Sequence, residues 1–433
     1  MLEKLFKLKE NKTTVSKEIL AGMVTFMAMA YIIFVNPGIL SEGMGKEFFP
    51  AITVATCIAA GIMTICMGLF TNYPLALASG MGLNAVVTYT VILGMKQPWQ
   101  VAMGLIVAEG FVVTILVLTN IRELVMDAIP IDLKRAIGVG IGLFIALIGF
   151  KNANIVVANP VTLVAFGKLG PENLIALFGL LLTIILMAKQ VKGAIFIGII
   201  ISTLVAIVTG QVKMPETWIS TVKPEYFRTF FAFDLRGVFN LGLGLTTFAI
   251  LITDFFDTMG TVVAVGDEGG FTTKDGKVPR LKSVLLVDSL AAMVGGLCGC
   301  SSVTTYVESA AGVGEGGRTG LTSVVTGILF LLAMFFTPVV GIVPGYATAP
   351  ALIIVGFMML NVIRLIKWDD FATAFPAFLT MTVIPFTYSI SNGIGYGFIT
   401  YVLIKLFSGK AKEVHPLMYA VAVLFGIYFI FAV

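Results

Sequence analysis

The sequence predicts an all-α polytopic membrane protein of about 14 spans, arranged as a seven-plus-seven inverted repeat. Three observations support this prediction: the composition, the recurrence of long apolar segments, and similarity between the two halves. Of the 433 residues, 58% are hydrophobic and 12% are charged, whereas soluble domains have about 25% charged residues. The apolar segments are continuous and often about 20 residues long, which indicates helices rather than the alternating strands of a membrane barrel.

Fourteen apolar segments are predicted to cross the bilayer: 19–41, 50–70, 79–94, 100–119, 131–150, 172–188, 193–210, 242–262, 283–298, 305–315, 320–340, 347–363, 370–388 and 391–408. Residues 416–432 form a further apolar segment, for which a fifteenth crossing and a position along the membrane both stay open. Residues 1–18 are basic and amphipathic, and they are predicted to be a cytoplasmic tail.

Positive charge is distributed unevenly between the two sides of this topology. With the N-terminus in the cytoplasm, 20 of the 28 Lys and Arg residues fall on the cytoplasmic side. Cytoplasmic loops of membrane proteins carry such an excess. We therefore expect a multi-pass protein of the cell (plasma) membrane, with the lipid bilayer as its partner. The net charge of +4 needs no nucleic-acid partner to explain it.

The two halves of the chain resemble each other. GMVTFMAMAYIIFVNPG, residues 22–38, matches GLTTFAILITDFFDTMG, residues 244–260, at an offset of 222, and two later pairs of segments match in the same order. The halves, 19–210 and 242–408, each hold seven predicted spans. Because seven is odd, the second half would enter the membrane from the opposite side, as in the inverted repeats of many secondary transporters.

One glycine-rich span in each half is predicted to be interrupted. TNYPLALASGMGLNAVVTYTV, residues 71–91, contains Pro74, and GGLCGCSSVTTYVESAAGVGEGG, residues 295–317, contains three successive β-branched residues. Proline fits poorly inside a helix, and β-branched residues favour extended backbone. Each stretch therefore predicts a short extended piece followed by a half-helix, and the two pieces could satisfy each other's backbone groups by pairing. Close helix packing is the alternative for such glycine-rich spans.

Five acids lie inside predicted spans and away from the span ends: Glu109, Asp254, Asp257, Asp288 and Glu308. A carboxylate at this depth is costly, so it normally faces a cavity or a polar partner. These spans contain no Lys or Arg that could form a salt bridge. Asp254 and Asp257 are three residues apart and share one helix face. Glu109 and Asp288 are isolated in their spans, and a structural role, bonded to Ser, Thr or backbone groups, is favoured for them.

Four motifs carry a family resemblance: FVNPGIL (34–40), GMGLNA (80–85), DFFDTMGT (254–261) and TTYVESAAGVGEGGRTGL (304–321). They resemble the signatures of azaguanine-type purine permeases, a branch of the nucleobase–ascorbate transporter (xanthine/uracil permease) superfamily. The resemblance implies a core domain, residues 19–119 and 242–340, that moves against a gate domain, residues 129–210 and 347–408. It also implies proton-coupled import of purine bases (hypoxanthine, guanine or adenine) by alternating access, and it suggests a homodimer.

The resemblance and the pattern of acids together predict the site residues. The predicted substrate-binding residues are Glu308, Asp254, Asn84, Gly82, Thr305, Phe26 and Phe248. Glu308, Asp254 and Asp257 are the predicted proton-coupling or site-supporting residues. A carboxylate accepts hydrogen bonds from purine N–H groups, and an amide can both donate and accept. The two phenylalanines are candidates to stack on the purine ring, although packing is the favoured alternative. Within the acid pair, Asp254 is expected to bind the substrate and Asp257 to support it.

Two other functional classes are less favoured. An anion carrier of the same architecture, for sulfate or bicarbonate, is the alternative, but acids in the site would repel a dianion. An enzyme is not expected, because the single histidine, His415, completes neither a serine–histidine dyad nor an H-E-x-x-H zinc motif. The sequence predicts no metal site and no cofactor. The four cysteines, Cys57, Cys66, Cys298 and Cys300, lie in or beside apolar segments and are expected to be small buried residues.

Overall fold

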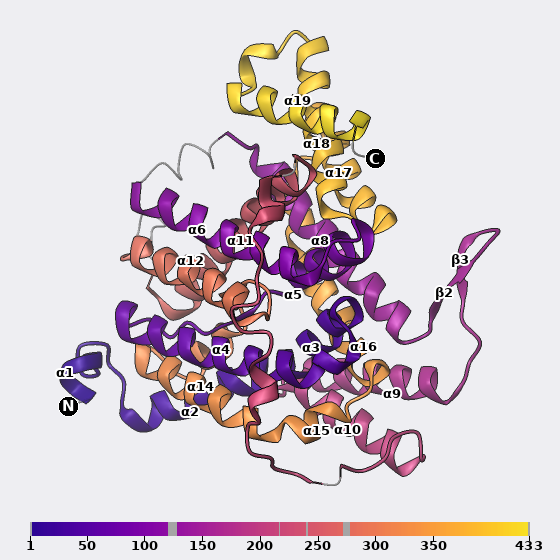
Figure 1. Cartoon of the computed structure of the whole chain (residues 1–433). Helices are drawn as coiled ribbons and strands as arrows, with labels where there is room; N and C mark the ends of the chain where they lie inside the picture. The colour runs from indigo at the N-terminus through magenta and orange to yellow at the C-terminus, as the bar shows by residue number, and fades with distance from the viewer. Residues whose placement is uncertain (1, 120–127, 216, 240, 272–277, 432–433) are drawn as a thin grey trace.

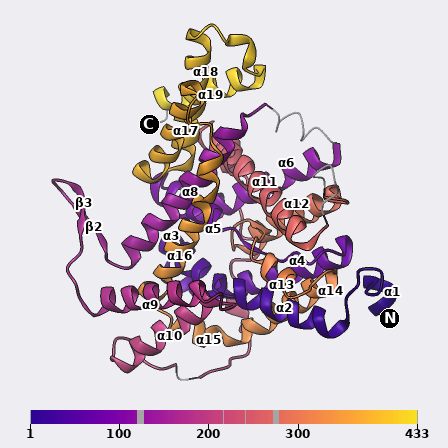
Figure 2. The same ribbon diagram turned by 180° about the vertical axis from the view of Figure 1, so that it is seen from behind.

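The computed structural model describes residues 2–119, 128–215, 217–239, 241–271 and 278–431. Three residues that contribute to the predicted charge asymmetry, Arg122, Lys274 and Lys277, lie outside these ranges. The described chain is a bundle of long helices with two short pairs of strands (Figure 1). The N-terminus and the β2–β3 hairpin lie on opposite sides of the bundle, and α17, α18 and α19 gather at a third edge (Figures 1 and 2).

The elements follow one another in this order: α1 (Leu2–Phe6), α2 (Val15–Met29), α3 (Ile32–Met44), η1 (Lys46–Phe48), α4 (Phe49–Thr71), β1 (Leu77–Ser79), α5 (Met81–Ala85), the π-helical η2 (Val86–Gly94), α6 (Trp99–Thr119), α8 (Ile131–Asn152), β2 (Val156–Asn159), β3 (Leu163–Phe166), α9 (Pro171–Ala188), α10 (Ala194–Val208), η3 (Pro224–Phe227), η4 (Arg236–Phe239), α11 (Leu241–Gly269), α12 (Leu281–Cys298), β4 (Val303–Thr305), α13 (Ser309–Gly314), α14 (Gly320–Ala333), η5 (Met334–Phe336), α15 (Thr337–Gly341), α16 (Gly345–Met359), η6 (Leu360–Leu365), α17 (Phe371–Thr387), α18 (Ile390–Phe407), η7 (Ala411–Glu413) and α19 (Pro416–Phe431).

The helices confirm the predicted polytopic, mainly helical character. Within the described ranges, 10 helical stretches are long and apolar enough to cross a membrane, and shorter apolar helices accompany them. Two predicted spans differ in detail. The first is broken between α2 and α3, and the span predicted at 305–315 contains a helix of only 6 residues, α13. The number of crossings and the inverted repeat stay predictions.

Glycines bring α4 and α14 into close contact, and the two helices lie side by side in both views (Figures 1 and 2). A methyl group on Gly68 would lie 2.3 Å from the carbonyl oxygen of Gly320, and one on Gly327 would lie 2.5 Å from that of Gly61. Any larger side chain at these positions would push the backbones apart. Small residues thus provide close packing between helices, as they commonly do in membranes.

The β2–β3 hairpin was not predicted. Val156 pairs with Phe166 and Asn159 with Leu163 in an antiparallel register. The Asn159 side chain closes the turn, because its Oδ1 accepts hydrogen bonds from the backbone N–H groups of Val161 (2.8 Å) and Thr162 (3.0 Å). Asparagine commonly makes such turns, so an asparagine between two β-branched runs was the signal that the sequence offered.

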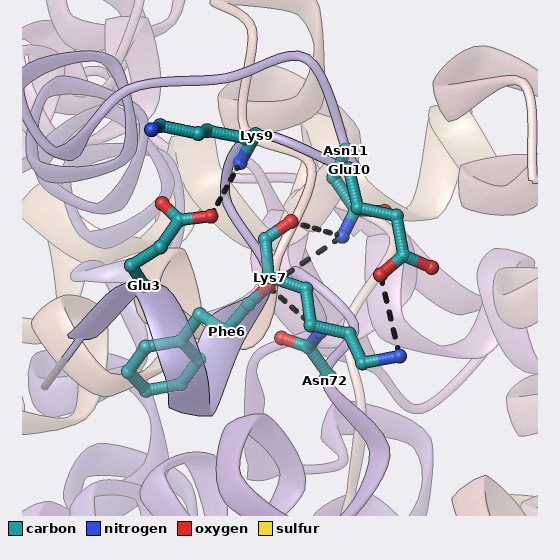
Figure 3. A network of polar contacts seen from close by, with 7 residues as sticks. All are labelled: Glu3, Phe6, Lys7, Lys9, Glu10, Asn11 and Asn72. Carbon is teal, nitrogen blue, oxygen red and sulfur yellow. Dashed lines mark hydrogen bonds and ion pairs between the residues drawn. The ribbon is translucent and has the colours of Figure 1, made fainter.

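The N-terminal segment is docked onto the end of α4, where Asn72 meets Phe6 (Figure 3), and onto α14. Asn72, which ends α4, donates from its side-chain amide to the carbonyl of Phe6 (3.0 Å) and accepts a hydrogen bond from the N–H of Gly320 (2.9 Å). Phe6 and Leu8 are buried in one apolar cluster with Leu321. This part of the predicted tail is therefore packed against the bundle.

A buried carboxylate on α2 caps the start of α14. Glu18 is 0% exposed. It accepts hydrogen bonds from the backbone N–H of Arg318 (2.8 Å), from that of Thr319 (3.3 Å), and from both the N–H (3.2 Å) and the hydroxyl (2.7 Å) of Thr322. The first N–H groups of a helix have no partner within the helix. Glu18 supplies that partner and thereby ties α2 to α14.

We predict that Glu18→Ala lowers the thermal unfolding midpoint of the protein in detergent. The change leaves several buried N–H donors without an acceptor, at roughly 1–3 kcal/mol for each group. Glu18→Gln should have a smaller effect, because its amide oxygen still accepts. The control is Glu10→Ala, which removes an exposed acid paired with Lys7 at 3.3 Å. Equal midpoints for Glu18→Ala and Glu10→Ala would contradict the capping role.

Candidate functional site

The two interrupted spans meet as a pair of strands, as the sequence predicts. β1 and β4 are antiparallel, with Leu77 opposite Thr305 and Ser79 opposite Val303. All residues of both strands are buried. Backbone that leaves a helix at membrane depth must find partners within the protein. Each strand is therefore the hydrogen-bonding partner that the other requires.

Further hydrogen bonds extend the pair at both ends. Gly80 N–H donates to the carbonyl of Ser302 (2.9 Å), and Tyr306 N–H donates to that of Ala76 (2.9 Å). The Tyr306 hydroxyl also donates to the carbonyl of Ser79 (2.5 Å). The half-helix α5 begins just after one end of the pair, and α13 begins a few residues beyond the other. The predicted half-helices thus start from opposite ends of one hydrogen-bonded unit.

Glu308 and Asp257 form a group with two tyrosines. The Tyr31 hydroxyl, from the break between α2 and α3, donates to Glu308 Oε1 (2.5 Å). Asp257 on α11 is exposed, and Glu308 is half-buried. The charges of these two acids interact with each other and with the phenols of Tyr31 and Tyr306. Asp257 and Glu308 are called the accessible group below, since Tyr31 is 1% exposed and Tyr306 is 6% exposed. Sequence reasoning missed both tyrosines, although a single phenol inside an apolar run was a usable signal.

Asp288 on α12 holds β4 in place. Its Oδ1 accepts hydrogen bonds from the N–H (2.8 Å) and the hydroxyl (2.7 Å) of Thr305. Its Oδ2 accepts from the Thr258 hydroxyl (2.7 Å), which is also hydrogen-bonded to the Thr304 hydroxyl (2.7 Å). Asp288 is only 4% exposed, and these contacts match the structural alternative. Thr305 is a predicted substrate ligand, and its N–H and its hydroxyl both donate to Asp288.

Asp254 lies in different surroundings from Asp257, although both are on α11. Asp254 is 1% exposed. Its carboxyl group lies close to the Thr304 side chain and to the Glu109 carboxyl on α6. Glu109, Asp254 and Asp288 are called the buried acids below. The structure therefore brings Asp257 together with Glu308, and Asp254 together with the buried acids.

Asn84 and Gly82 lie on α5, close to the end of β1. The Ser79 hydroxyl shares its single hydrogen between the carbonyl of Cys300 (2.5 Å) and Asn84 Oδ1 (2.8 Å). Asn84 Nδ2 has no acceptor among the described residues, although Asn84 is 0% exposed. A methyl group on Gly82 would lie 2.8 Å from Cγ2 of Ile141 on α8. Asn84 thus offers an unused amide donor, and Gly82 permits close approach of α5 to α8.

The two predicted stacking residues have apolar neighbours. The ring of Phe26 meets that of Phe330 edge to face, with centroids 5.1 Å apart. Phe248 packs, partly buried, against the largest apolar core. Both environments match the packing alternative for these rings.

A cavity of about 750 Å³ is lined by neither the accessible group nor the buried acids. Residues of α3, α8, α16 and the β2–β3 hairpin line it, and its polar lining includes Glu42 and Lys151, which form an ion pair of 3.5 Å. Phe34 on α3 also lines it, about one turn beyond Tyr31.

The described residues offer no metal centre. No group of three His, Cys, Asp or Glu side chains among them is arranged to hold a metal ion. The four cysteines are free thiols, and Cys57, Cys298 and Cys300 are buried. The chemistry available in this region is therefore that of carboxyl, phenol, hydroxyl and amide groups.

Residues 16–396 match the family model Xan_ur_permease, which is described as a permease family. The chain belongs to the nucleobase–ascorbate transporter family. Among similar members of this family, adenine permease AdeP of Escherichia coli (strain K12) is 41% identical over 432 residues, covering 100% of this chain and 96% of AdeP. Guanine/hypoxanthine permease PbuG of Bacillus subtilis (strain 168) is 43% identical over 441 residues, covering 99% and 100%.

Solved structures share the fold of this nucleobase–ascorbate transporter. The transmembrane domain of a cyanobacterium bicarbonate transporter, BicA, superposes with a TM-score of 0.64 at 13% identity, covering 87% of this chain and 96% of that domain. The murine anion transporter Slc26a9, in its inward-facing state, gives a TM-score of 0.65 at 10% identity, covering 90% and 68%. At such low identity the likeness concerns the fold alone.

We predict that cysteines at positions 79 and 303 form a disulfide across the strand pair. The hydrogen bonds at both ends make Ser79 and Val303 a non-hydrogen-bonded antiparallel pair, with Cα atoms about 4.5 Å apart, a distance that a disulfide can span. The variant Ser79→Cys/Val303→Cys, without the native cysteines, should lose both thiols on mild oxidation, as counted by maleimide labelling and mass spectrometry.

The matched control is Ser79→Cys/Thr305→Cys, in which the new cysteines are displaced by two residues. Diagonal neighbours are about 7–8 Å apart, so this variant should keep its thiols. Efficient cross-linking of the displaced pair, with none at positions 79 and 303, would show that the register is wrong.

Proposed function

We propose that this protein is a secondary active transporter that imports purine nucleobases such as hypoxanthine, guanine or adenine. We further propose proton symport through alternating access. The observation that carries the proposal is the identity of 41% to an adenine permease and of 43% to a guanine/hypoxanthine permease, in each case over nearly the whole chain. Similarity along the entire length argues that the site was retained together with the scaffold.

The side chains near the strand pair suit a flat, neutral purine. A purine presents N–H donors on some edges and ring nitrogen or carbonyl acceptors on others. Tyr31 engages Oε1 of Glu308, so Oε2 can accept from a purine N–H. Asp257 is exposed and offers a second acceptor. The unused amide donor of Asn84 is 0% exposed, so it can donate to a purine acceptor only after α5 moves during transport.

Exposure suggests a division of labour between the two acids of α11. The sequence favours Asp254 as the substrate ligand, but Asp254 is 1% exposed and faces the buried acids. Asp257 is exposed and lies near Glu308. A ligand must be within reach of the substrate, so we assign substrate contact to Asp257 and proton coupling to Asp254.

Packing supports a division into core and gate domains. The most extensive contacts join α4 with α14 and α6 with α12 on one side, and α8 with α16 and α17 with α18 on the other. Two half-exposed ion pairs connect the two proposed domains, Glu42–Lys151 at 3.5 Å and Glu315–Lys192 at 3.7 Å. Exposed pairs of this kind contribute only about 0–1 kcal/mol each. They could therefore open and close as one domain moves against the other.

The remaining parts of the proposal concern orientation and assembly. We place the protein in the plasma membrane with its N-terminus in the cytoplasm, following the distribution of Lys and Arg. A homodimer is the proposed assembly. Anion transport is disfavoured, although proteins of similar fold transport anions. Asp257 and Glu308 would repel an anion, whereas they can bind the N–H edge of a neutral base.

We predict that Glu308→Gln abolishes uptake of labelled hypoxanthine by cells while the protein still reaches the membrane. Each hydrogen bond to a charged acceptor contributes about 1.5–3 kcal/mol, and 1.4 kcal/mol corresponds to about tenfold in affinity. Tyr31→Phe should weaken uptake less, because it keeps the carboxylate. Competition by adenine, guanine, xanthine and uracil would define the preferred base. Normal uptake by Glu308→Gln would remove this residue from the site.

We predict that Asp257→Asn and Asp254→Asn fail in different ways. Asp257→Asn should raise the dissociation constant of hypoxanthine, measured by equilibrium binding to the purified protein. Asp254→Asn should preserve binding and lose accumulation driven by a pH gradient. The opposite pattern, with lost binding in Asp254→Asn and normal binding in Asp257→Asn, would restore Asp254 as the substrate ligand.

A further inference from the structure

Glu109 on α6 and Asp254 on α11 face each other inside the bundle. Glu109 is 0% exposed and Asp254 is 1% exposed. Their carboxyl groups lie close to each other. Neither oxygen of Glu109, nor Oδ1 of Asp254, accepts a hydrogen bond from any described donor. Two buried carboxyl groups thus lie together, and three of their four oxygens have no hydrogen-bond donor among the described residues.

The surrounding charges make double ionisation of this pair unfavourable. The charge of Asp288 on α12 interacts with both carboxyl groups, and the charge of Asp257 on α11 interacts with that of Asp254. These neighbours are also acids, and the ion pairs formed by the described residues involve neither Glu109 nor Asp254. Ionising both of two carboxyl groups in contact, without a cation, is costly, so the pair binds a proton readily. One shared proton removes the conflict, because it gives a strong O–H···O⁻ hydrogen bond.

We propose that the Glu109–Asp254 pair is the binding site of the transported proton, which makes Glu109 a proton-coupling residue. This inference rests on the proposed proton-coupled purine transport. In each cycle one proton passes from water to a carboxylate oxygen of the pair, and the charge of the pair changes from two negatives to one. The proton later returns to water on the other side of the membrane, and no other covalent bond changes.

The surroundings favour a proton over a metal ion as the ligand of this pair. No group of three acidic, His or Cys side chains among the described residues is arranged to hold a metal ion. The close packing of α6 against α12 also leaves little space, since a methyl group on Gly110 would lie 2.7 Å from the backbone nitrogen of Met293. A shared proton needs no cavity and no further ligands.

A close approach of Asp254 to Thr304, followed by hydrogen bonds, connects this pair to β4 and so to the accessible group. The Asp254 carboxyl lies close to the side chain of Thr304, whose hydroxyl is bonded to the Thr258 hydroxyl at 2.7 Å. Thr258 donates to Asp288, and Asp288 holds the N–H and hydroxyl of Thr305. A change of charge at the pair therefore acts directly on the strand that leads to Glu308.

Asp257 gives the proton a route between water and the pair. It lies three residues after Asp254 on α11, hence on the same helix face, and it is exposed. A proton that arrives from the accessible side can pass from Asp257 toward Asp254. Substrate contact at Asp257 would then influence the exchange of protons with the buried pair.

The test uses the purified full-length protein in liposomes that contain a pH-sensitive dye. With the wild type, addition of hypoxanthine outside should acidify the lumen. Glu109→Gln keeps the shape and the polar contacts of Glu109 but cannot release a proton. It should lose both the acidification and the accumulation driven by a pH gradient. It should still bind hypoxanthine and exchange labelled for unlabelled base, and its binding should no longer vary with pH. Glu47→Gln, which changes an exposed acid, serves as the control.

Each outcome decides the question. Acidification by Glu109→Gln equal to that of the wild type overturns the inference and leaves the proposed function standing. The inference also fails if hypoxanthine uptake by the wild type responds to a Na⁺ gradient and not to a pH gradient. It fails again if a stable Glu109→Gln protein no longer binds hypoxanthine. A wild type that transports no purine overturns the proposed function itself. If Glu109→Gln does not fold, Asp254→Asn must show the same loss of coupling with binding retained.

Discussion

The pairing of β1 with β4 is the constraint on which the rest of this structure depends. A helix satisfies its own backbone within a membrane, whereas extended segments cannot do so alone. Residues Leu77–Ser79 and Val303–Thr305, which lie far apart in the sequence, satisfy each other. The helices around them must hold this register, and they do so through close glycine contacts and through side chains such as Asp288. The strand pair in turn determines where Asn84 and Glu308 lie.

The strand pair also separates two environments, and α11 places one acid in each of them. Asp257 is exposed near Glu308, while Asp254 is buried against Glu109. Recognition of a neutral base and binding of a proton demand opposite surroundings. The base needs acceptors that it can reach, and a proton is held best where charging both of two carboxyl groups is costly. Threonine hydroxyls along β4 connect the two environments, which provides a physical path for coupling without direct contact between base and proton.

Much of this architecture could be predicted from the sequence. Apolar runs indicated nearly all of the long helices, because burial in lipid requires length and continuity. The β-branched residues of β4 indicated extended backbone, and the structure pairs that strand with β1. The break between α2 and α3 escaped prediction, because the residues on both sides are equally apolar. The β2–β3 hairpin escaped because each of its strands has only 4 residues, too few for a clear alternating pattern.

The arrangement of the site was less predictable for a different reason. Motifs identified Glu308, Asp254 and Asp257, but the pattern of residues on α11 could not tell which acid is buried. That depends on which helices cover each face, and so on contacts with α6 and α12. The contact of Glu109 with Asp254, and that of Tyr31 with Glu308, join segments far apart in the chain. Local periodicity contains no information about such pairs.

The central claim is that the strand pair brings the substrate to the accessible group. A structure of the protein determined with bound hypoxanthine tests it most directly. We expect density for the base within hydrogen-bonding distance of the Glu308 carboxylate, beside Asp257, with the Asn84 amide on its far edge. Density confined to the cavity lined by Glu42 and Lys151, with no contact to Glu308, would contradict the claim.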